Sequence, residues 1–309
     1  MTSTDATTAR PRVTAVVVMY DSAADAARVV ETCLAQHDVD LDVVVVDNGS
    51  NDDSAEQIDT RFGSEPRVTL VRMEHNRGFS GGANTGMAAA LDRGADYVWL
   101  LTDDLELDAD AARELVSAME AHPEAGAAGQ YIYHRDEPDR IYFGGGVVTE
   151  DGSTHERMDE RDGASNDGTP QAVRETGFVT GASMFFRAGV LREVGLMDET
   201  YWLYWEDVDL SYRVKEGGHT LIVVPASKAW HHVTPALDRS MRTRQRYFWR
   251  NFLRFQIKHG LATKGAAAWA MAKRVPDTRR REGRSAALTQ ARSILDFLLG
   301  RSGPIKGRW

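Results

Sequence analysis

Cysteine and long apolar runs are nearly absent from this chain. Its 309 residues contain one cysteine, Cys33, which excludes an internal disulfide framework and favours a reducing compartment. No apolar run is long enough to cross a bilayer, and the residues from Met1 to Arg12 contain no signal-peptide core. These absences predict a cytoplasmic protein with a short, loose tail over residues 1–12.

Two glycine-rich signatures are also missing. There is no G-x-x-x-x-G-K-[ST] motif, which disfavours a P-loop NTPase. No G-x-G-x-x-G follows the first expected strand, which disfavours a dinucleotide site. Internal repeats are absent too, and the length suits one large α/β domain with an appendage.

Charge is divided unequally between two segments. Residues 240–309 contain 17 Lys and Arg against three acidic residues, a net charge of +14, while residues 1–239 carry −23. Such an asymmetry indicates two surfaces with different partners.

Strands and helices alternate through the first third of the chain. Apolar, β-branched runs predict strands at 13–19, 41–46, 68–73 and from Tyr97 to just before Asp103. Helical spacing is found at 23–36, at 54–62 and after a glycine-rich turn as far as Leu91. This alternation predicts βαβ units with right-handed crossovers and a mostly parallel sheet, an α/β fold.

Polar side chains follow three of these strands: Tyr20-Asp21, Asp47-Asn48 and Asp103-Asp104. Ligands of open α/β sheets bind outside this carboxyl edge, where Asp47 can accept hydrogen bonds from a base or ribose. The alternative for Asp47 is a turn residue in D-N-G-S.

Asp103 and Asp104 repel each other unless they share a proton or a cation, and a divalent cation with a bound diphosphate would satisfy both. The alternative is an N-cap for a helix beginning near Asp108.

The glycine-rich turn from His75 to Asn84 offers backbone N–H groups and Arg77 to a phosphate. Its glycines are equally compatible with close packing of a helix. Farther along, strands are predicted at 125–133, 178–187 and 221–224, with a possible hairpin arm at 141–149 and an exposed polar loop at 150–171. Small residues in the 178–187 strand, Gly181 and Ala182, indicate close approach of a ligand or another backbone.

Aromatic residues, among them Trp202 and Trp205, precede the carboxylates Glu206, Asp207 and Asp209. Aromatic rings beside acids are typical of sugar sites, and a carboxylate there can remove a proton from an acceptor hydroxyl. The alternative is that acids simply favour the first turn of a helix. His231 can complete a cation site begun by Asp104, or have no ligand role.

Taken in order, these motifs resemble glycosyltransferase family 2, the inverting nucleotide-sugar transferases with a GT-A fold. The resemblance covers about residues 13–260. It is carried by Val16–Asp21, Val45–Ser50, Asn76–Gly82, Thr102–Asp104 in the place of a D-x-D motif, Trp205–Asp207 and Trp230–His231. Thr102 stands where many relatives have the first acid, and Asp21 replaces a frequent Asn. The closest sub-pattern is that of rhamnosyl- and galactofuranosyltransferases.

The resemblance implies a role for each group of residues. Asp207 is the expected base, with Glu206 or Asp209 orienting the acceptor or holding Asp207. Mg²⁺ or Mn²⁺ rests on Asp104, with His231 and Asp103. The donor is a UDP- or dTDP-linked sugar, such as dTDP-rhamnose or a UDP-hexose or UDP-galactofuranose. Its expected contacts are Tyr20, Asp21, Asp47, Asn76, Arg77, Gly78, Gly81, Asp103 and Asp104. The expected acceptor contacts are Gly181, Ala182, Trp202, Trp205 and Asp209.

Two other functions are weighed against this one. A sugar-1-phosphate nucleotidyltransferase has a similar sheet, but its glycine- and arginine-rich signature loop is absent after Met19. A non-catalytic sugar-binding protein of the same fold is disfavoured by the presence of Asp104, Asp207 and His231.

Three parts are expected: the tail, a GT-A domain at 13–238 with a nucleotide half to about 107 and an acceptor half after it, and a basic helical region at 239–309. That region has helical spacing at 239–261 and 286–299 and a basic run at 279–284. It predicts either peripheral contact with a membrane that carries a lipid-linked acceptor, or packing within the chain or a homodimer. Packing is favoured for its aromatic residues, and no nucleic acid partner is expected.

Overall fold

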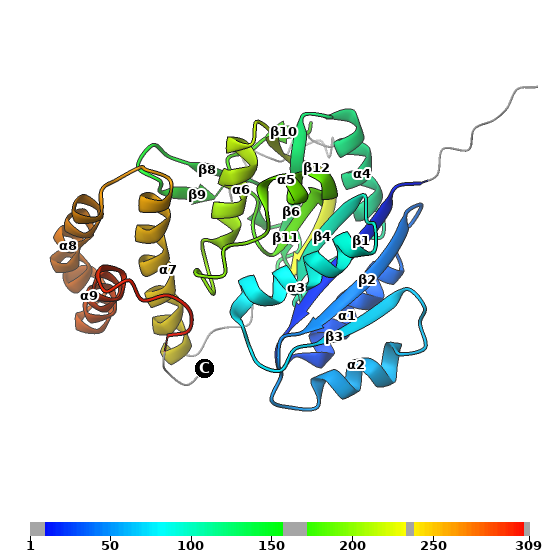
Figure 1. Ribbon diagram of the computed structural model, residues 1–309, viewed down its shortest axis with the longest axis horizontal. Helices are drawn as coiled ribbons and strands as arrows, with labels where there is room; N and C mark the ends of the chain where they lie inside the picture. Colours follow the sequence, from blue (N-terminus) through cyan, green and yellow to red (C-terminus); the bar gives the residue numbers. More distant parts are fainter. Residues whose placement is uncertain (1–9, 157–171, 233–237, 306–309) are drawn as a thin grey trace, which may run out of the picture.

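The computed structural model describes residues 10–156, 172–232 and 238–305, with the side chains of Glu156 and of 238–240 excepted. Its centre is a sheet in the order β10-β12-β6-β11-β4-β1-β2-β3, to which β5 and β7 add at β12 and β6 (Figure 1). A separate pair is formed by β8 and β9. The strands are β1 (Arg12–Met19), β2 (Asp40–Asp47), β3 (Val68–Arg72), β4 (Tyr97–Thr102), β5 (Leu105–Leu107), β6 (Ala125–His134), β7 (Ile141–Phe143), β8 (Gly146–Val148), β9 (Thr154–Glu156), β10 (Arg174–Glu175), β11 (Ser183–Arg187) and β12 (Thr220–His231).

Strands β1 to β4 are parallel to one another, and β12 is parallel to β6. Between them β11 runs antiparallel to both β4 and β6. The part of the sheet formed by residues before Asp103 is therefore parallel, as the alternation of strands and helices predicted.

Helices cover both faces of the sheet. They are α1 (Ala23–Leu34), α2 (Ser54–Phe62), α3 (Gly78–Asp92), α4 (Ala111–Ala121), α5 (Ala188–Val194), α6 (Glu206–Glu216), α7 (Asp238–Lys258), α8 (Lys264–Arg281) and α9 (Arg284–Leu298). Odd-numbered residues of β1, such as Val17, pack with α1, α2 and α4, while Val16 and Val18 pack with α3, α5 and α6. Alternate side chains of a strand point to opposite faces, so both faces of β1 are buried.

The last three helices form a group beside the sheet. Helix α7 is the member nearest the sheet, while α8 and α9 lie outside it (Figure 1). Buried Phe252 and Phe255 of α7, Met271 of α8 and Phe297 of α9 join the larger hydrophobic core. The prediction of packing for the aromatic residues of α7 is therefore confirmed for these side chains. No helix within the described part of the chain is long and apolar enough to cross a bilayer.

Several expected elements differ in extent. The strand expected at 221–224 continues to His231 because a register shift between Val224 and Lys228 accommodates Pro225, which has no N–H group to donate. The strand expected from Phe178 begins only at Ser183, and the expected arm at 141–149 is divided between β7 and β8. Helices α5 and α8 were not predicted. Residues 1–9 of the expected tail and 157–171 of the expected loop lie outside the described residues.

Candidate active site

The three polar strand ends meet at one edge of the sheet, as predicted. Met19 is paired with Asp47, and Val18 with Thr102, so β1, β2 and β4 end at the same level. The turns that follow are joined by short contacts: the Ser50 hydroxyl accepts from the Asp21 backbone N–H at 3.0 Å, and the Asn51 amide donates to the Tyr20 hydroxyl at 2.6 Å. Asp47 caps its own turn by accepting from the Ser50 N–H at 3.0 Å.

Asp103 lies at the centre of this edge, hydrogen-bonded to the Ser22 hydroxyl. Burial raises the pKa of Asp103 to about 7; the Ser22 hydrogen bond opposes the rise and the charge of Asp104 adds to it. Near neutral pH, the protonated and ionised forms of Asp103 are therefore both populated, chiefly because the group is buried.

Asp104 is paired with His231, which lies 127 positions later in the sequence. Antiparallel pairing of β12 with β5 sets His231 opposite Leu105, and its Nε2 lies 2.9 Å from Asp104 Oδ2. The Thr102 hydroxyl donates to Oδ1 at 2.7 Å. Burial raises the pKa of Asp104, but the hydrogen bonds and charge of His231 and Thr102 outweigh it and leave the pKa below its ordinary value. Asp104 is therefore ionised at neutral pH.

The donor atoms of this pair fit a divalent cation. No group of three or more potential metal-ligating side chains occurs in the described part of the chain, so Asp104 and His231 leave most coordination positions to other ligands. Mg²⁺ is commonly bound by one or two carboxylates together with substrate phosphates, and carboxylate and imidazole both suit Mn²⁺. The Nδ1 atom of His231 is buried and has no hydrogen-bond partner among the described residues.

Asn48 ties the end of β2 to the glycine-rich turn. Its amide donates to the Gly78 carbonyl at 3.0 Å, and its carbonyl oxygen accepts from the Arg77 N–H at 3.1 Å. A Cβ at Gly82 would lie 2.8 Å from Val18, so this glycine lets α3 approach β1 closely. The alternative considered for these glycines, close packing of a helix, is therefore observed at Gly82. It does not conflict with a ligand contact by the turn.

Arg77, expected near phosphate, forms an ion pair with Glu199 at 2.5 Å. A Cβ at Gly81 would lie 2.5 Å from the Arg77 Cβ, so Gly81 gives the Arg77 side chain its room. Asn76 closes the turn by accepting from the Gly78 N–H at 2.7 Å. Glu199 was not predicted from the sequence, since no local pattern links it to the turn.

Asp207 is connected to the strand edge through Gly181 and Ala182. The Gly181 N–H donates to Asp207 Oδ2 at 2.8 Å, and the Ala182 carbonyl accepts from the Thr102 N–H at 3.0 Å. Burial raises the pKa of Asp207, and the hydrogen bonds from Gly181 and Val208 oppose the rise. The structure therefore brings the E-D motif, the Gly181–Ala182 segment and the Asp104–His231 pair into one region.

Glu206 differs from its neighbour in having little access to solvent. Only 4% of the residue is exposed, and Oε2 has no hydrogen-bond partner among the described residues. Burial, followed by the charge of Asp207, raises the pKa of Glu206 well above its ordinary value. The surroundings of Glu206 therefore favour its neutral form over the carboxylate.

The segment leading to this motif has a strained backbone. Trp202, Tyr204 and Trp205 have φ angles of +68°, +67° and +76°, in the left-handed region that side chains other than glycine rarely adopt. Each such residue costs about 1–3 kcal/mol and persists only where its surroundings fix it. The Asn251 amide of α7 donates to the carbonyls of Tyr201, Leu203 and Tyr204 at 2.8, 2.8 and 2.9 Å. We call residues 201–205 the acceptor loop.

The acceptor loop also contacts the nucleotide half. Gly78 has a φ of +75°, and a Cβ there would lie 2.5 Å from the Trp202 carbonyl oxygen. Trp202 thus packs against the start of α3. Trp205 does not reach this surface. It is 3% exposed, and its ring lies 5.1 and 5.2 Å from those of Phe252 and Phe255.

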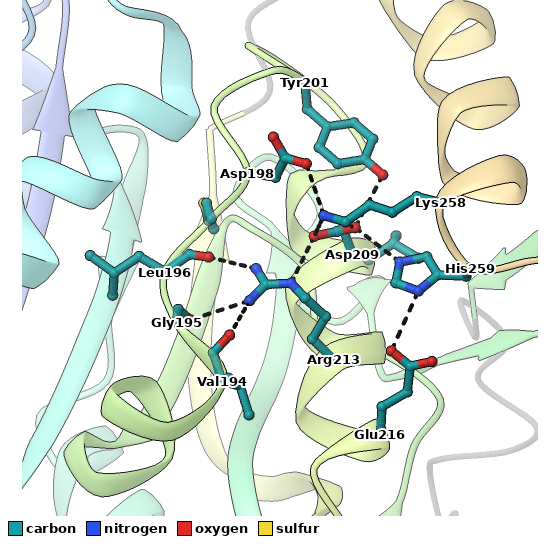
Figure 2. A network of polar contacts seen from close by, with 12 residues as sticks. Val194, Gly195, Leu196, Asp198, Tyr201, Asp209, Arg213, Glu216, Lys258 and His259 are labelled. Atoms are coloured by element: carbon teal, nitrogen blue, oxygen red, sulfur yellow. Dashed lines mark hydrogen bonds and ion pairs between the residues drawn. The ribbon is translucent and has the colours of Figure 1, made fainter.

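Asp209 is likewise buried, at the centre of a polar network between α6 and α7 (Figure 2). Lys258, His259 and Arg213 lie 2.8, 2.9 and 3.0 Å from its oxygens, and the Tyr201 hydroxyl donates to it at 3.1 Å. Burial raises the pKa of Asp209, but His259 and Lys258 outweigh it and lower the pKa to about 2.

The side chain of Asp209 is 0% exposed and its oxygens are fully engaged, so the expectation that Asp209 and Trp205 contact the acceptor is corrected. Trp205 anchors the end of the acceptor loop against α7, and Asp209 binds the Tyr201 hydroxyl at its start. Asn251, Lys258 and His259, which hold this loop, were missed because nothing in the sequence links α7 to residues some fifty positions earlier.

Comparison with known sequences agrees with this arrangement. A family profile for glycosyl transferase family 2 matches residues 14–195, more than half of the chain. An N-acetylglucosaminyl-diphospho-decaprenol L-rhamnosyltransferase from Mycobacterium tuberculosis (strain CDC 1551 / Oshkosh) is 25% identical over 72% of this chain and 82% of its own length. The galactofuranosyltransferase GlfT1 of Mycolicibacterium smegmatis is 29% identical over 57% of this chain and 56% of its own.

Solved structures show the same fold. The mannosyltransferase PcManGT from Pyrobaculum calidifontis, in complex with GDP-Man and Mn²⁺, has a TM-score of 0.64 with 17% identity, covering 96% of this chain and 89% of its own. GalNAc-T7 with UDP, GalNAc and Mn²⁺ has a TM-score of 0.63 with 15% identity, covering 80% of this chain and 48% of its own. The fold is the GT-A fold, a mostly parallel sheet between helices. The chain belongs to glycosyltransferase family 2.

Proposed function

We propose that this glycosyltransferase moves a sugar from a nucleoside-diphosphate sugar to an acceptor hydroxyl by a single displacement with inversion. One observation carries the proposal: Gly181 and Ala182 link the buried carboxylate of Asp207 directly to the strand end that bears Asp104. This link supports a base at Asp207 and a cation site at Asp104 on two sides of one region.

The donor occupies the carboxyl edge of the sheet. Tyr20, Asp21 and Asp47 contact the base and ribose, and Asp103 contacts the ribose or the cation. The turn of Asn76, Arg77, Gly78 and Gly81 lies beside the diphosphate, where backbone N–H groups and a guanidinium suit its charge.

Asp104 and His231, with Asp103 beside them, would hold Mg²⁺ or Mn²⁺. A cation held there would supply positive charge beside the leaving nucleoside diphosphate. Asp104 suits this role because it is ionised at neutral pH, and the Thr102 hydroxyl fixes its orientation at 2.7 Å.

Asp207 removes the proton from the acceptor hydroxyl as that oxygen attacks the anomeric carbon. The new carbon–oxygen bond forms on the face opposite the departing diphosphate, so the anomeric configuration inverts. Backbone N–H groups of Gly181 and Val208 hold the two carboxylate oxygens at 2.8 Å each and so fix the direction of proton transfer. Trp202 offers its ring to the acceptor sugar, and Glu206 lies next to Asp207 in the chain.

The donor sugar is rhamnose, from dTDP-rhamnose, or a hexose or galactofuranose carried on UDP. The names of two relatives, a rhamnosyltransferase and a galactofuranosyltransferase, support these choices. The name of the former includes a polyprenyl diphosphate acceptor, which supports a lipid-linked acceptor over a free glycan or small molecule.

A donor panel tests this function. The protein is incubated with UDP-, dTDP- and GDP-sugars and Mn²⁺, and the released nucleotide is identified with and without candidate acceptors. Nucleoside diphosphate as product supports the proposal. Pyrophosphate would instead favour nucleotidyl transfer, and no turnover or thermal stabilisation with any donor would favour non-catalytic sugar binding.

A further inference from the structure

Exposed apolar side chains are concentrated in the C-terminal helices. Among the described residues, eight large hydrophobic side chains are exposed, and seven of them lie between Met241 and Leu299. Four belong to α9 and the residue that follows it: Leu288, Leu295, Leu298 and Leu299. The described residues before α7 contribute only Val147. An apolar surface of this kind marks a contact with another partner.

The four leucines form one stripe on α9. Leu288, Leu295 and Leu299 are separated by seven and four residues, so they project from the same side of the helix, and Leu298 flanks them. They are 60%, 51%, 57% and 44% exposed, respectively. The opposite side of α9, with Ile294 and Phe297, is already buried in the core. Helix α9 is therefore apolar on two sides, of which only one is covered.

Positive charge borders this stripe. A hollow of about 400 Å³ between α7 and α9 is lined by Arg242, Arg246 and Arg292, with Leu288 of the stripe at its wall. No acidic residue is among those that line it, although Arg246 also pairs with Asp296 at 2.6 Å. One guanidinium group can donate two parallel hydrogen bonds to two oxygens of a phosphate. A hollow lined by three arginines therefore suits a phosphate monoanion or diester.

We propose that the outer side of α9 docks on a membrane surface that contains anionic phospholipid. The leucine stripe enters the boundary between headgroups and acyl chains, and the arginines of the hollow bind lipid phosphates. A second copy of the chain fits less well, because a two-fold interface would set this positive surface against itself. Contact with the acidic part of a second copy would be head-to-tail, which gives rings or filaments rather than a two-fold dimer.

This surface goes beyond the proposed function and does not depend on it, but the two share a helix. Arg246, which lines the hollow, precedes Asn251, which holds the acceptor loop, by five residues of α7. Five residues span about 7.5 Å of helix axis. Docking would therefore bring the acceptor loop close to the membrane, where a lipid-linked acceptor is found.

Co-sedimentation with vesicles tests the proposal. The full-length protein is mixed with vesicles of phosphatidylcholine alone or of phosphatidylcholine with phosphatidylglycerol, at low and at high salt. We expect binding to the phosphatidylglycerol vesicles only, with release as salt screens the charges.

Two double variants separate the two components. Leu295→Ser with Leu299→Ser removes two of the four leucines of the stripe, and Arg242→Glu with Arg292→Glu reverses two of the three charges that line the hollow. Each should reduce the vesicle partition coefficient at least about tenfold, since each nearby basic residue contributes several-fold to binding. The matched controls are Val147→Ser and Arg93→Glu, which lie before α7 in the chain. They should change the partition coefficient less than about twofold.

Equal recovery with neutral and anionic vesicles would overturn the proposal, as would double variants that bind like the controls. A dimer in sedimentation velocity that is lost in Leu295→Ser with Leu299→Ser, without vesicle binding by the parent, would assign the surface to a second copy. Nucleoside diphosphate binding, measured in solution on the same variants, should stay unchanged. Its absence in the parent would count against the proposed function and leave the vesicle result intact.

Discussion

The two sides of the active site are stabilised in different ways. At the nucleotide edge, Asp21, Asp47 and Asp103 are held by Ser50 and Ser22, within the first hundred residues. The acceptor loop has three residues in strained conformations, and the contacts that fix it come from α7, near the end of the chain. These contacts of the nucleotide edge are local, although Asp104 also pairs with the distant His231. The acceptor loop, in contrast, is fixed by a helix about fifty residues later in the chain. Substitutions can therefore damage one side without the other.

The largest effect is expected at the cation pair. Asp104→Ala should abolish metal-dependent binding of nucleoside diphosphate, because it removes the carboxylate that faces His231. His231→Ala should weaken this binding by about tenfold or more, since loss of a group that only orients a ligand already costs about that much. Calorimetric titration with and without Mn²⁺ measures both.

A matched control for these two variants is Glu106→Ala, which removes a nearby carboxylate that pairs with Arg135 at 3.4 Å. It should leave nucleotide binding as it is. Metal-dependent affinity that persists in Asp104→Ala would remove Asp104 from the cation site.

The acceptor loop should respond to substitution on α7. Asn251→Ala deletes the amide that reaches three carbonyls of residues 201–204 and leaves those carbonyls without this donor. We expect an unfolding free energy lower by about 1–3 kcal/mol and a kcat for transfer lower by about tenfold, with donor affinity unchanged.

Gln256→Ala, on the same helix, removes a single hydrogen bond to the Asp151 carbonyl and serves as control. If Asn251→Ala weakened donor binding as much as transfer, the two sides of the site would not be independent.

A smaller effect concerns pH and stability. The pKa of Asp209 is about 2 in the folded protein, below the ordinary value of 3.8. Its ionised form therefore stabilises the fold fully at pH values above about 3.8. This contribution, about 2 kcal/mol, is lost as the pH falls through the folded pKa. Asp209→Asn should be less stable at neutral pH and should lose less stability between about pH 5 and 2.

Chemical denaturation at several pH values measures this difference. Asp92→Asn, an exposed acid at the end of α3, should keep the parental pH dependence. Parallel curves for the parent and Asp209→Asn would show that the network around Lys258 and His259 does not hold Asp209 ionised.

Sequence was a better guide to one side than to the other. Each strand end of the nucleotide edge carries its own acid, and parallel pairing brings those ends together, so Asp47, Asp103 and Asp104 were predicted to meet. Trp205 and Asp209 were misplaced because helix-start acids and aromatic residues look alike whether they face a ligand or a neighbouring helix. Contacts with Phe252, Phe255 and Lys258 of α7 turn Trp205 and Asp209 toward this helix. Helical periodicity predicted α7 but not its position.

The measurement that tests the account most directly is transfer by Asp207→Asn, run beside Glu206→Gln and a donor titration for each. We predict that Asp207→Asn loses at least about a hundredfold in kcat, the low end for loss of a general base, while donor and Mn²⁺ still bind. Glu206→Gln should retain more activity because the surroundings of Glu206 favour its neutral form, which an amide resembles. Since burial raises the pKa of Asp207, the parental kcat/KM should fall on the acid side at a pH above the ordinary aspartate pKa of 3.8. Near-parental transfer by Asp207→Asn, or an inactive Glu206→Gln, would contradict the assignment of the base.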